Sequence, residues 1–216
     1  NMFSKIFPKI HAEGYKFLVI AGIITIIFYS FSDFLGLLGL ILTVWVYYFF
    51  RDPERVIIND HNFLVSPADG EVIKVEEVDG PKELNLESKK FKKISIFMNI
   101  FDCHVNRTPC QGKIEEILYK PGKFFNASLD KASEENERNY FKIKDVHGND
   151  IILVQIAGLV ARRIVCETSK EQELSQGDRV GMIRFGSRAD VYYENYEPLV
   201  KVGQKAISGE TLLAKK

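Results

Sequence analysis

The sequence contains few of the residues that cross-link a fold or bind a metal ion. Only three of its 216 residues are cysteines, and four are histidines. An odd number of cysteines is a poor basis for a disulfide framework, which leaves Cys166 without an expected role. Cys103, His104 and Cys110 match no standard zinc-ligand spacing, and a fourth ligand is not evident. The sequence therefore predicts neither disulfide bonds nor a metal site.

The chain also lacks an excess of charge, internal repeats and low-complexity tracts. It has 29 Lys and Arg residues and 29 Asp and Glu residues, so its formal net charge is zero. A nucleic-acid-binding domain usually has an excess of positive charge, so no nucleic-acid partner is predicted. Any affinity for a membrane must come from local sequence. The length fits one domain or two, with enough apolar residues for a substantial core.

Two apolar runs, 17–31 and 34–50, lie near the N-terminus and are separated only by Ser32 and Asp33. Each is slightly shorter than the ~20 residues that a spanning helix usually needs. A secretory signal would have one apolar core and a small-residue cleavage site, whereas here a second run follows at once and ends in aromatic residues that suit a membrane interface. We therefore favour a membrane-embedded helical hairpin over residues 1–50, rather than a buried segment of a soluble core.

Basic residues flank this hairpin on both sides. They are Lys5, Lys9 and Lys16 before it, and Arg51 and Arg55 after it. By the positive-inside bias, both ends should lie on the cytoplasmic face of the cell (inner) membrane, together with the rest of the chain. Asp33 falls at the turn, where a helix cap or a place near the far headgroups is expected rather than a functional charge inside the membrane.

The remainder, residues 51–216, consists of short β-branched stretches separated by Gly, Pro, Asn and Asp. The predicted strands are 63–65, 71–78, 93–99, 113–119, 140–144, 151–157, 179–185 and 189–193. Strands at this spacing without alternating helices favour an antiparallel sandwich or barrel, so the predicted fold class is α+β. The segment 159–166 fits a strand or a short helix, and the polar segment 128–139 is typical of a mobile loop.

Gly186 and Ser187 stand between two of these predicted strands, in the run RFGSRADVY. A serine held in a tight turn after glycine can attack the preceding carbonyl, because glycine has no side chain to block the attack and tolerates strained dihedrals. Elimination from the resulting ester would leave a pyruvoyl group on residue 187. The dipeptide by itself favours an ordinary turn or loop over self-cleavage, because Gly-Ser is common in turns.

Five motifs in one order give this dipeptide a context. They are SPADGEV (66–72), FMNIFDCHVNRTPCQG (97–112), NER (136–138), QIAGLVARRI (155–164) and GMIRFGSRADVY (181–192). Together they resemble the phosphatidylserine decarboxylase family in its short form. The resemblance implies cleavage between Gly186 and Ser187 into a β chain (1–186) and an α chain (187–216) that stay together, with the pyruvoyl cofactor on residue 187.

The same resemblance implies the reaction. The amine of phosphatidylserine would form a Schiff base with the pyruvoyl ketone, CO2 would leave, and hydrolysis would release phosphatidylethanolamine for phospholipid biosynthesis. Because the electron sink is built from the protein, no pyridoxal phosphate is required. The implied partners are phosphatidylserine, the bilayer and the two chains of one precursor, and a homo-oligomer remains compatible with the sequence.

His104 is the only histidine inside one of the motifs, and an isolated histidine of this kind is usually structural. With the resemblance, it becomes the candidate base for Ser187 and the general acid of decarboxylation. Asp69 would orient His104 or the Gly186–Ser187 bond, although PADG is also good turn chemistry. The long form of the family has a second histidine where this chain has Arg107. Either His104 therefore serves both steps, which we favour, or another group supplies the base for cleavage.

Four further residues are candidates for substrate binding. Arg107 could bind the lipid phosphate or carboxylate through its fork of donors, or form a structural ion pair. Asn136 and Arg138 belong to the NER motif, and Gly158 would let the backbone approach the substrate or a neighbouring strand.

Two rival functions remain. A noncatalytic membrane-anchored β module would need no chemistry at Ser187. A pyruvoyl enzyme for a soluble amino acid is disfavoured by the hairpin, because a soluble substrate gives no reason for a membrane anchor.

Overall fold

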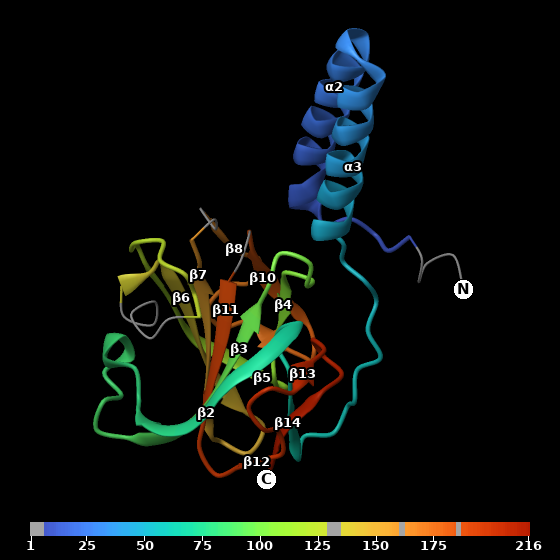
Figure 1. Cartoon of the computed structure of the whole chain (residues 1–216). Helices are drawn as coiled ribbons and strands as arrows, with labels where there is room; N and C mark the ends of the chain where they lie inside the picture. The colour runs from blue at the N-terminus through green and yellow to red at the C-terminus, as the bar shows by residue number, and fades with distance from the viewer. Residues whose placement is uncertain (1–6, 129–134, 160–162, 185–186) are drawn as a thin grey trace. The chain divides into compact units, whose positions relative to one another are not determined.

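The structure, a computed structural model, describes residues 7–128, 135–159, 163–184 and 187–216. The chain divides into two compact units, Asn1–Glu54 and Arg55–Lys216. The first unit is helical, and the second is built almost entirely of strands (Figure 1). The predicted α+β class, a helical pair followed by a mainly antiparallel β domain, is therefore confirmed.

The helical unit consists of a 3₁₀ turn, η1 (Ala12–Gly14), and two helices, α2 (Tyr15–Phe31) and α3 (Asp33–Phe49). Ser32 between the helices is extended, with φ −169°, and its Oγ accepts a hydrogen bond from Phe34 N at 3.3 Å. Ser32 is thus the N-cap of α3. Asp33 is the first residue of α3, where its negative charge interacts favourably with the positive end of the helix dipole.

Small residues allow the two helices to pack closely. A Cβ atom added at Gly36 would lie 2.2 Å from the Tyr29 ring, and one added at Gly39 would lie 3.0 Å from Thr25 Cα. Thr25 Oγ1 and Thr43 Oγ1 share a hydrogen bond of 2.9 Å between the helices. Glycine and threonine contacts of this kind are typical of helix pairs in membranes.

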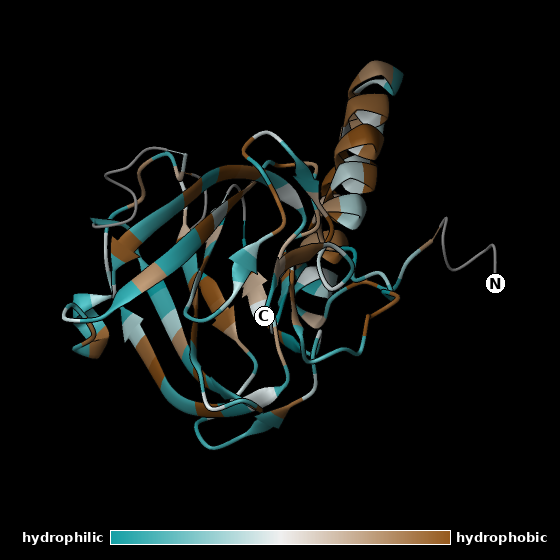
Figure 2. Ribbon diagram, turned by 90° about the horizontal axis from the view of Figure 1, so that it is seen from below, coloured by the Kyte–Doolittle hydropathy of each residue, from teal (hydrophilic) through white to brown (hydrophobic). Residues whose placement is uncertain are grey.

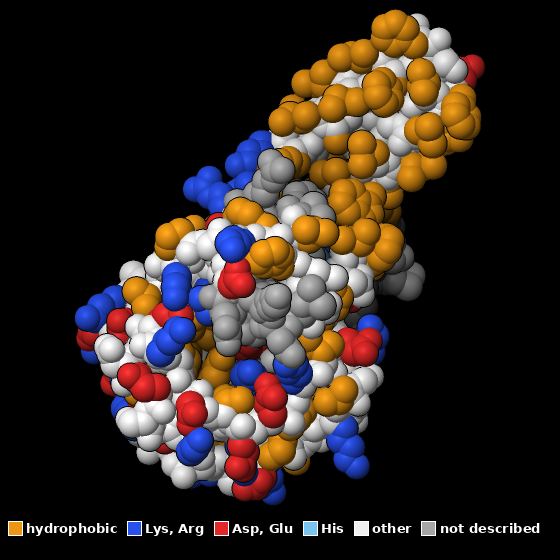
Figure 3. Space-filling view, turned by 60° about the vertical axis from the view of Figure 1, so that its left-hand side comes forward, with side chains coloured by type: hydrophobic (Ala, Val, Ile, Leu, Met, Phe, Trp, Pro, Cys, Tyr) orange, Lys and Arg blue, Asp and Glu red, His pale blue; other side chains and the backbone are white. Residues whose placement is uncertain are grey.

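The outer surface of the helical unit is covered by hydrophobic side chains (Figure 3). The segment Ala12–Phe31 has 20 residues and could cross a membrane by length and composition, whereas α3 with 17 residues is shorter. Little of this segment is buried inside the structure, unlike a core helix of a soluble protein. The unit is therefore compatible with membrane association.

The second unit contains an antiparallel sheet of eight strands in the order β13-β2-β3-β11-β7-β6-β5-β9. Its bounds are β2 Gly70–Asp79, β3 Lys90–Met98, β5 Gly112–Lys120, β6 Arg138–Asp145, β7 Asp150–Ala157, β9 Glu173–Leu174, β11 Ser187–Tyr193 and β13 Lys205–Ala206. The sheet is curled into a half-barrel, with β11 between β3 and β7 (Figure 1). A short 3₁₀ turn, η2 (Lys82–Leu84), lies in the β2–β3 connection.

Two three-stranded sheets accompany the large one. They are β1 (Phe63–Val65), β14 (Leu212–Lys215) and β12 (Glu197–Pro198), and β4 (Val105–Arg107), β10 (Arg179–Ile183) and β8 (Ile164–Cys166), each in that order. All their pairings are antiparallel. The pairing of β10 with β4 matters most for function, because the chain continues from β10 toward Ser187.

Side-chain alternation gives the large sheet two apolar faces. Along β7, Ile151 and Leu153 join the main core inside the curl, whereas Ile152 and Val154 join a smaller cluster on the outer face. Every residue of β7 is buried. A strand covered on both sides favours apolar residues on both of its faces, which explains the unbroken run IILV. Figure 2 shows hydrophobic and hydrophilic positions alternating along other strands.

The sequence located the long strands correctly. The stretches 71–78, 113–119 and 151–157 match β2, β5 and β7 to within one residue at each end. It missed β4, β9, β12, β13 and β14, which have only two to four residues and cannot show a period-two pattern.

The structure also describes parts of the two segments 159–166 and 128–139. The described end of 159–166 is the strand β8 and not a helix. The mobile-loop prediction for 128–139 is wrong at its C-terminal end, because Asn136 is buried and β6 begins at Arg138.

Candidate active site

Ser187 is the first residue of β11 and is fully buried. It pairs with Met98 at the end of β3 and with Ala157 at the end of β7. The following alternate residues of β11 face the main core, so the Ser187 side chain lies inside the curl, with Oγ 3.7 Å from Met98 Sδ. The strand thus begins two residues earlier than the sequence predicts. Gly186 lies outside the described residues.

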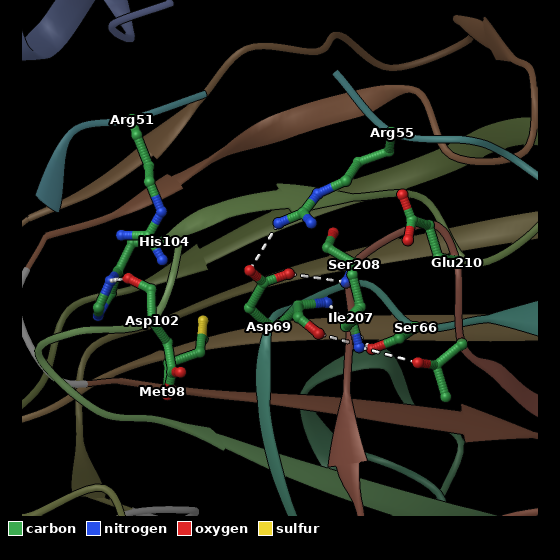
Figure 4. Close-up of polar contacts among 12 residues, drawn as sticks. Arg51, Arg55, Ser66, Asp69, Met98, Asp102, His104, Ile207, Ser208 and Glu210 are labelled. Atoms are coloured by element: carbon green, nitrogen blue, oxygen red, sulfur yellow. Dashed lines mark hydrogen bonds and ion pairs between the residues drawn. The ribbon is translucent and has the colours of Figure 1, made fainter. Parts of the chain in front are cut away.

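His104 lies beside the segment that leads to Ser187. Its carbonyl oxygen accepts a hydrogen bond of 3.2 Å from the amide of Ile183, the last residue of β10. The imidazole is buried, and its Nδ1 lies 3.0 Å from the carbonyl oxygen of Asp102 (Figure 4). A carbonyl can only accept, so the neutral ring carries its proton on Nδ1. Nε2 is therefore the nitrogen that can take a proton from a nucleophile.

Asp69 is held by two donors in the turn before β2. Arg55 Nη2 donates to its Oδ2 at 2.6 Å, and the Ser208 amide donates to its Oδ1 at 2.8 Å (Figure 4). Both side chains of the Arg55–Asp69 pair are mostly buried, at 14% and 15% exposure. These contacts fix the PADG turn. From the sequence, Arg55 is expected only as a charge that flanks the hairpin, although its position immediately before the β unit is a signal for a role in that unit.

Asn136 connects a neighbouring loop to the strand beside Ser187. Its side-chain amide exchanges two hydrogen bonds of 2.8 Å with the backbone of Phe125, and its Nδ2 also donates to the carbonyl of Ala157 at 2.7 Å. Ala157 is the strand partner of Ser187, and the buried Gly158 follows it. The structure thus places Asn136 and Gly158 at the same end of the sheet as Ser187.

Arg107 and Arg138 have contacts that favour structural roles. Arg107 is buried and donates from Nη1 to the carbonyl of Gly177 at 2.9 Å. Arg138 pairs with Glu83 at 3.4 Å and lies 5.7 Å from the centre of the Tyr140 ring. Tyr140 belongs to the apolar cluster on the outer face of the sheet. Since Arg138 and Tyr140 are two residues apart on β6, the Arg138 side chain points away from the face that carries Ser187.

A buried chain of amide side chains was not foreseen from the sequence. Gln155 Nε2 donates to Asn106 Oδ1 at 2.9 Å, and Asn139 Nδ2 donates to Gln155 Oε1 at 3.4 Å. Asn106 Nδ2 also donates to Met98 Sδ at 3.6 Å, and this sulfur atom accepts a hydrogen bond of 3.7 Å from Ser187 Oγ. Asn106 and Gln155 lie within two of the motifs, but only the fold brings them together.

A second unforeseen feature is the ion pair Arg188–Asp190, immediately after Ser187. Arg188 Nη2 donates to Asp190 Oδ2 at 2.9 Å, Arg188 Nε lies 2.8 Å from Oδ1, and Nη1 donates to the carbonyl of Ala127 at 3.2 Å. Both side chains are almost completely buried. Alternation places the pair on the outer face, behind the strand that begins with Ser187.

The cysteines offer no competing nucleophile inside this core. No disulfide joins the three cysteines, all of which lie in the described part of the chain, and Cys103 and Cys110 are buried. Burial raises the pKa of the Cys110 thiol far above the physiological range, so it stays protonated. Within the described ranges, His, Cys, Asp and Glu form no cluster of three that could hold a metal ion.

Comparison with known proteins agrees with the geometry. The family model described as phosphatidylserine decarboxylase matches residues 42–214. The chain is 77% identical over 215 residues to the phosphatidylserine decarboxylase proenzyme of Pelagibacter ubique (strain HTCC1062), with all of both chains covered. Proteins of the same name from Ruegeria pomeroyi and Cereibacter sphaeroides are 54% and 49% identical to this chain, and the matches cover 94% and 93% of the lengths of those proteins. The same two matches cover 94% and 99% of the length of this chain. The chain therefore belongs to the phosphatidylserine decarboxylase family.

Proposed function

We propose that this protein cuts itself between Gly186 and Ser187 and then converts phosphatidylserine to phosphatidylethanolamine and CO2. Family membership supports the reaction, and the relatives are named as proenzymes. The observation that carries the proposal is the position of Ser187. It is a buried serine at the start of a central strand, preceded by glycine and approached by the His104 segment.

The maturation step uses residues of the chain itself. Ser187 Oγ attacks the Gly186 carbonyl carbon, the peptide bond to the Ser187 nitrogen breaks, and that nitrogen takes up a proton. Loss of the Ser187 α-proton then expels the Gly186 carboxylate and leaves a dehydroalanine. Addition of water releases ammonia and leaves the pyruvoyl group. Serine is a weak nucleophile at neutral pH, so a base is needed, and we assign that role to Nε2 of His104.

The environment of residue 187 suits such a group. The position is fully buried between Met98 and Ala157 on the apolar inner face. An uncharged dicarbonyl group is compatible with such a site, because its burial costs much less than the burial of a charge. Once formed, the pyruvoyl group supplies the electron sink for decarboxylation. We assign to His104 the delivery of the proton that replaces CO2.

The fold explains how the two chains would stay together after cleavage. The α chain, 187–216, would begin with β11, which pairs over all seven of its residues with β3 on one side and with β7 on the other. Two of its three other strands, β13 and β14, pair with β2 and β1 of the β chain, and the third, β12, pairs with β14. The core contains α-chain side chains such as Val191 and Leu213. Hydrogen bonds and apolar burial would therefore retain the α chain without a covalent link.

The remaining candidates take positioning roles. Asp69, through Arg55 and Ser208, fixes the turn at the start of β2, next to the strand that ends at Met98. We assign Asn136 and Gly158 to the edge of the substrate site, since both adjoin Ala157. The membrane-compatible helical unit would keep the enzyme beside its lipid substrate, on the cytoplasmic face of the inner membrane by the flanking basic residues.

The test is the intact mass of the purified protein. We expect two wild-type chains divided after Gly186, with the smaller one lighter by one ammonia than a chain that begins with serine. Ser187→Ala should remain a single chain, and the exposed Ser169→Ala should cleave like the wild type. A single uncut chain for the folded wild-type protein in lipid or detergent would overturn the proposal.

His104→Ala separates the two roles of the histidine. We expect an uncut chain if Nε2 is the base of maturation. A chain that cleaves normally but releases no CO2 from phosphatidylserine vesicles would restrict His104 to decarboxylation and assign the maturation base to another residue. Normal cleavage together with normal CO2 release would remove His104 from the mechanism.

A further inference from the structure

Three connections meet at the end of the large sheet where Ser187 lies. The last residues of β3 and β7 both pair with Ser187, so the segments 99–104 and 158–159 leave the sheet at this end. The segment 121–128 is brought to the same end by Asn136, which binds both Phe125 and the carbonyl of Ala157. These three segments therefore lie at the end of the sheet where residue 187 begins β11.

These segments expose large apolar side chains, although connections on a water-soluble domain are usually polar. Ile100, Phe101, Phe125 and Leu159 are 42%, 59%, 38% and 67% exposed, and we call these four residues the apolar rim. At the opposite end, the described connections 80–89 and 146–149 expose one large apolar residue, Val146. Single exposed apolar residues are ordinary, whereas several from separate loops at one end indicate an interaction surface.

Basic side chains accompany the rim. Lys123 Nζ lies 5.5 Å from the centre of the Phe125 ring and is paired with Glu135 Oε2 at 2.7 Å. Arg163 is exposed, and its backbone carbonyl accepts a hydrogen bond of 3.2 Å from the Arg184 amide, in the segment that leads to Ser187. The acidic Asp102 turns back on its own loop, where it accepts from the Asn99 amide at 2.8 Å. Figure 3 shows hydrophobic and basic side chains reaching the surface of this unit near one another. Apolar residues beside cations are the combination that binds an anionic lipid surface.

We propose that the apolar rim inserts into an anionic phospholipid leaflet, so that the entrance to residue 187 opens directly onto the lipid phase. This inference rests on the proposed function in one respect, since a lipid headgroup must reach a buried residue 187. The insertion is a property of the β unit itself and is additional to the apolar helices. The rim would hold the acyl chains, and the basic residues would attract the phosphate and carboxylate groups.

Depth-dependent fluorescence quenching tests the insertion without any catalysis. Trp45 is the only tryptophan, so Trp45→Phe gives a silent background in the full chain. Phe101→Trp is then placed in vesicles of phosphatidylcholine and phosphatidylglycerol, with bromine on the acyl chains. Phosphatidylglycerol is anionic but has no amine, so it cannot be decarboxylated. We expect bromine to remove most of the fluorescence at position 101 and little at the control Val146→Trp; equal, weak quenching at both positions would overturn the proposal.

Activity on two forms of the substrate separates this inference from the proposed function. We expect Ile100→Ser/Phe101→Ser/Leu159→Ser to cleave normally by intact mass. Its rate on vesicle phosphatidylserine, relative to its rate on dispersed short-chain phosphatidylserine, should fall by at least about tenfold. Val146→Ser should leave this ratio unchanged. An unchanged ratio in the triple variant would refute insertion. A wild-type protein that is a dimer in detergent, together with a triple variant that is a monomer, would also refute insertion and would assign the rim to contacts with a second copy of the chain. An uncut wild-type chain would count against the proposed function alone, because the quenching result does not depend on cleavage.

Discussion

The buried ion pair behind Ser187 makes a sharp prediction about stability. Asp190→Asn keeps the shape of the side chain but removes the carboxylate that faces both Nε and Nη2 of Arg188. The two side chains are 0% and 1% exposed, so water cannot replace the lost interaction without opening the strand. Removal of one partner of a buried pair costs about 3–5 kcal/mol. A domain of this size loses about 2–4 °C of Tm per kcal/mol, so we expect Tm to fall by roughly 6–20 °C.

The assay is thermal unfolding of the full chain in detergent, followed by near-ultraviolet circular dichroism. All variants are made in a Ser187→Ala background, so that the chain stays in one piece and unfolding is unimolecular. The matched control is Asp79→Asn, which breaks an exposed pair with Lys90 on a neighbouring strand of the same sheet. An exposed pair contributes about 0–1 kcal/mol, so this variant should unfold close to the parent.

A double variant tests the cause of the loss. Arg188→Met/Asp190→Leu replaces both charges with apolar side chains, and such replacements of a buried pair are often neutral or stabilising. We therefore expect it to recover most of the Tm lost by Asp190→Asn. If Asp190→Asn unfolds at the same temperature as Asp79→Asn, the pair does not carry the stability assigned to it, and the reasoning from burial fails.

Three further predictions concern other parts of the molecule. Asn136→Ala removes one buried and two partly buried hydrogen bonds, so we expect a loss of about 2–3 kcal/mol in the free energy of unfolding and slower self-cleavage by intact mass. Burial raises the pKa of the Asp150 carboxyl, but hydrogen bonds from two lysines lower it more, so that its folded pKa lies below the usual value. The stabilisation by Asp150 is therefore present above the unfolded pKa of about 3.9 and is lost as pH falls through the folded pKa. The free energy of unfolding of the wild type should exceed that of Asp150→Asn by about 1 kcal/mol near neutral pH, and this difference, followed by thermal unfolding, should vanish in acid. Gly36→Leu should cost the helical pair about 1–3 kcal/mol because its Cβ has no space, whereas Gly22→Leu, with nothing within 4 Å, should not, as followed by helical circular dichroism during heating.

The sequence was sufficient for the elements that carry a long regular pattern. The apolar runs predicted the helical pair, and period-two stretches predicted β2, β5 and β7 almost to the residue. Local chemistry made the Gly186–Ser187 bond a candidate for self-cleavage, which stays a prediction, and only the five ordered motifs favoured it over an ordinary turn. The five ordered motifs then predicted the family, which the comparisons confirm.

The surroundings of Ser187 could not be predicted in the same way. A period-two pattern indicates that a strand has two faces, but it does not indicate which strands become neighbours. The pairing of Ser187 with Met98 and Ala157 therefore could not be predicted from the sequence. For the same reason, the sequence could name Arg138 as a candidate for substrate binding, but only the structure places its side chain on the face of the sheet opposite Ser187.

Sequence alone thus determined the composition of this protein's parts, namely an apolar helical pair, a β domain and a Gly-Ser bond in a family motif. Only the tertiary structure decided which residues meet. It paired Arg55 with Asp69, buried Arg188 against Asp190, and brought connections with exposed apolar side chains to the end of the sheet where Ser187 lies. The physical reason is that these contacts join residues through the curl and register of a sheet, which depend on the packing of the whole chain rather than on any local pattern.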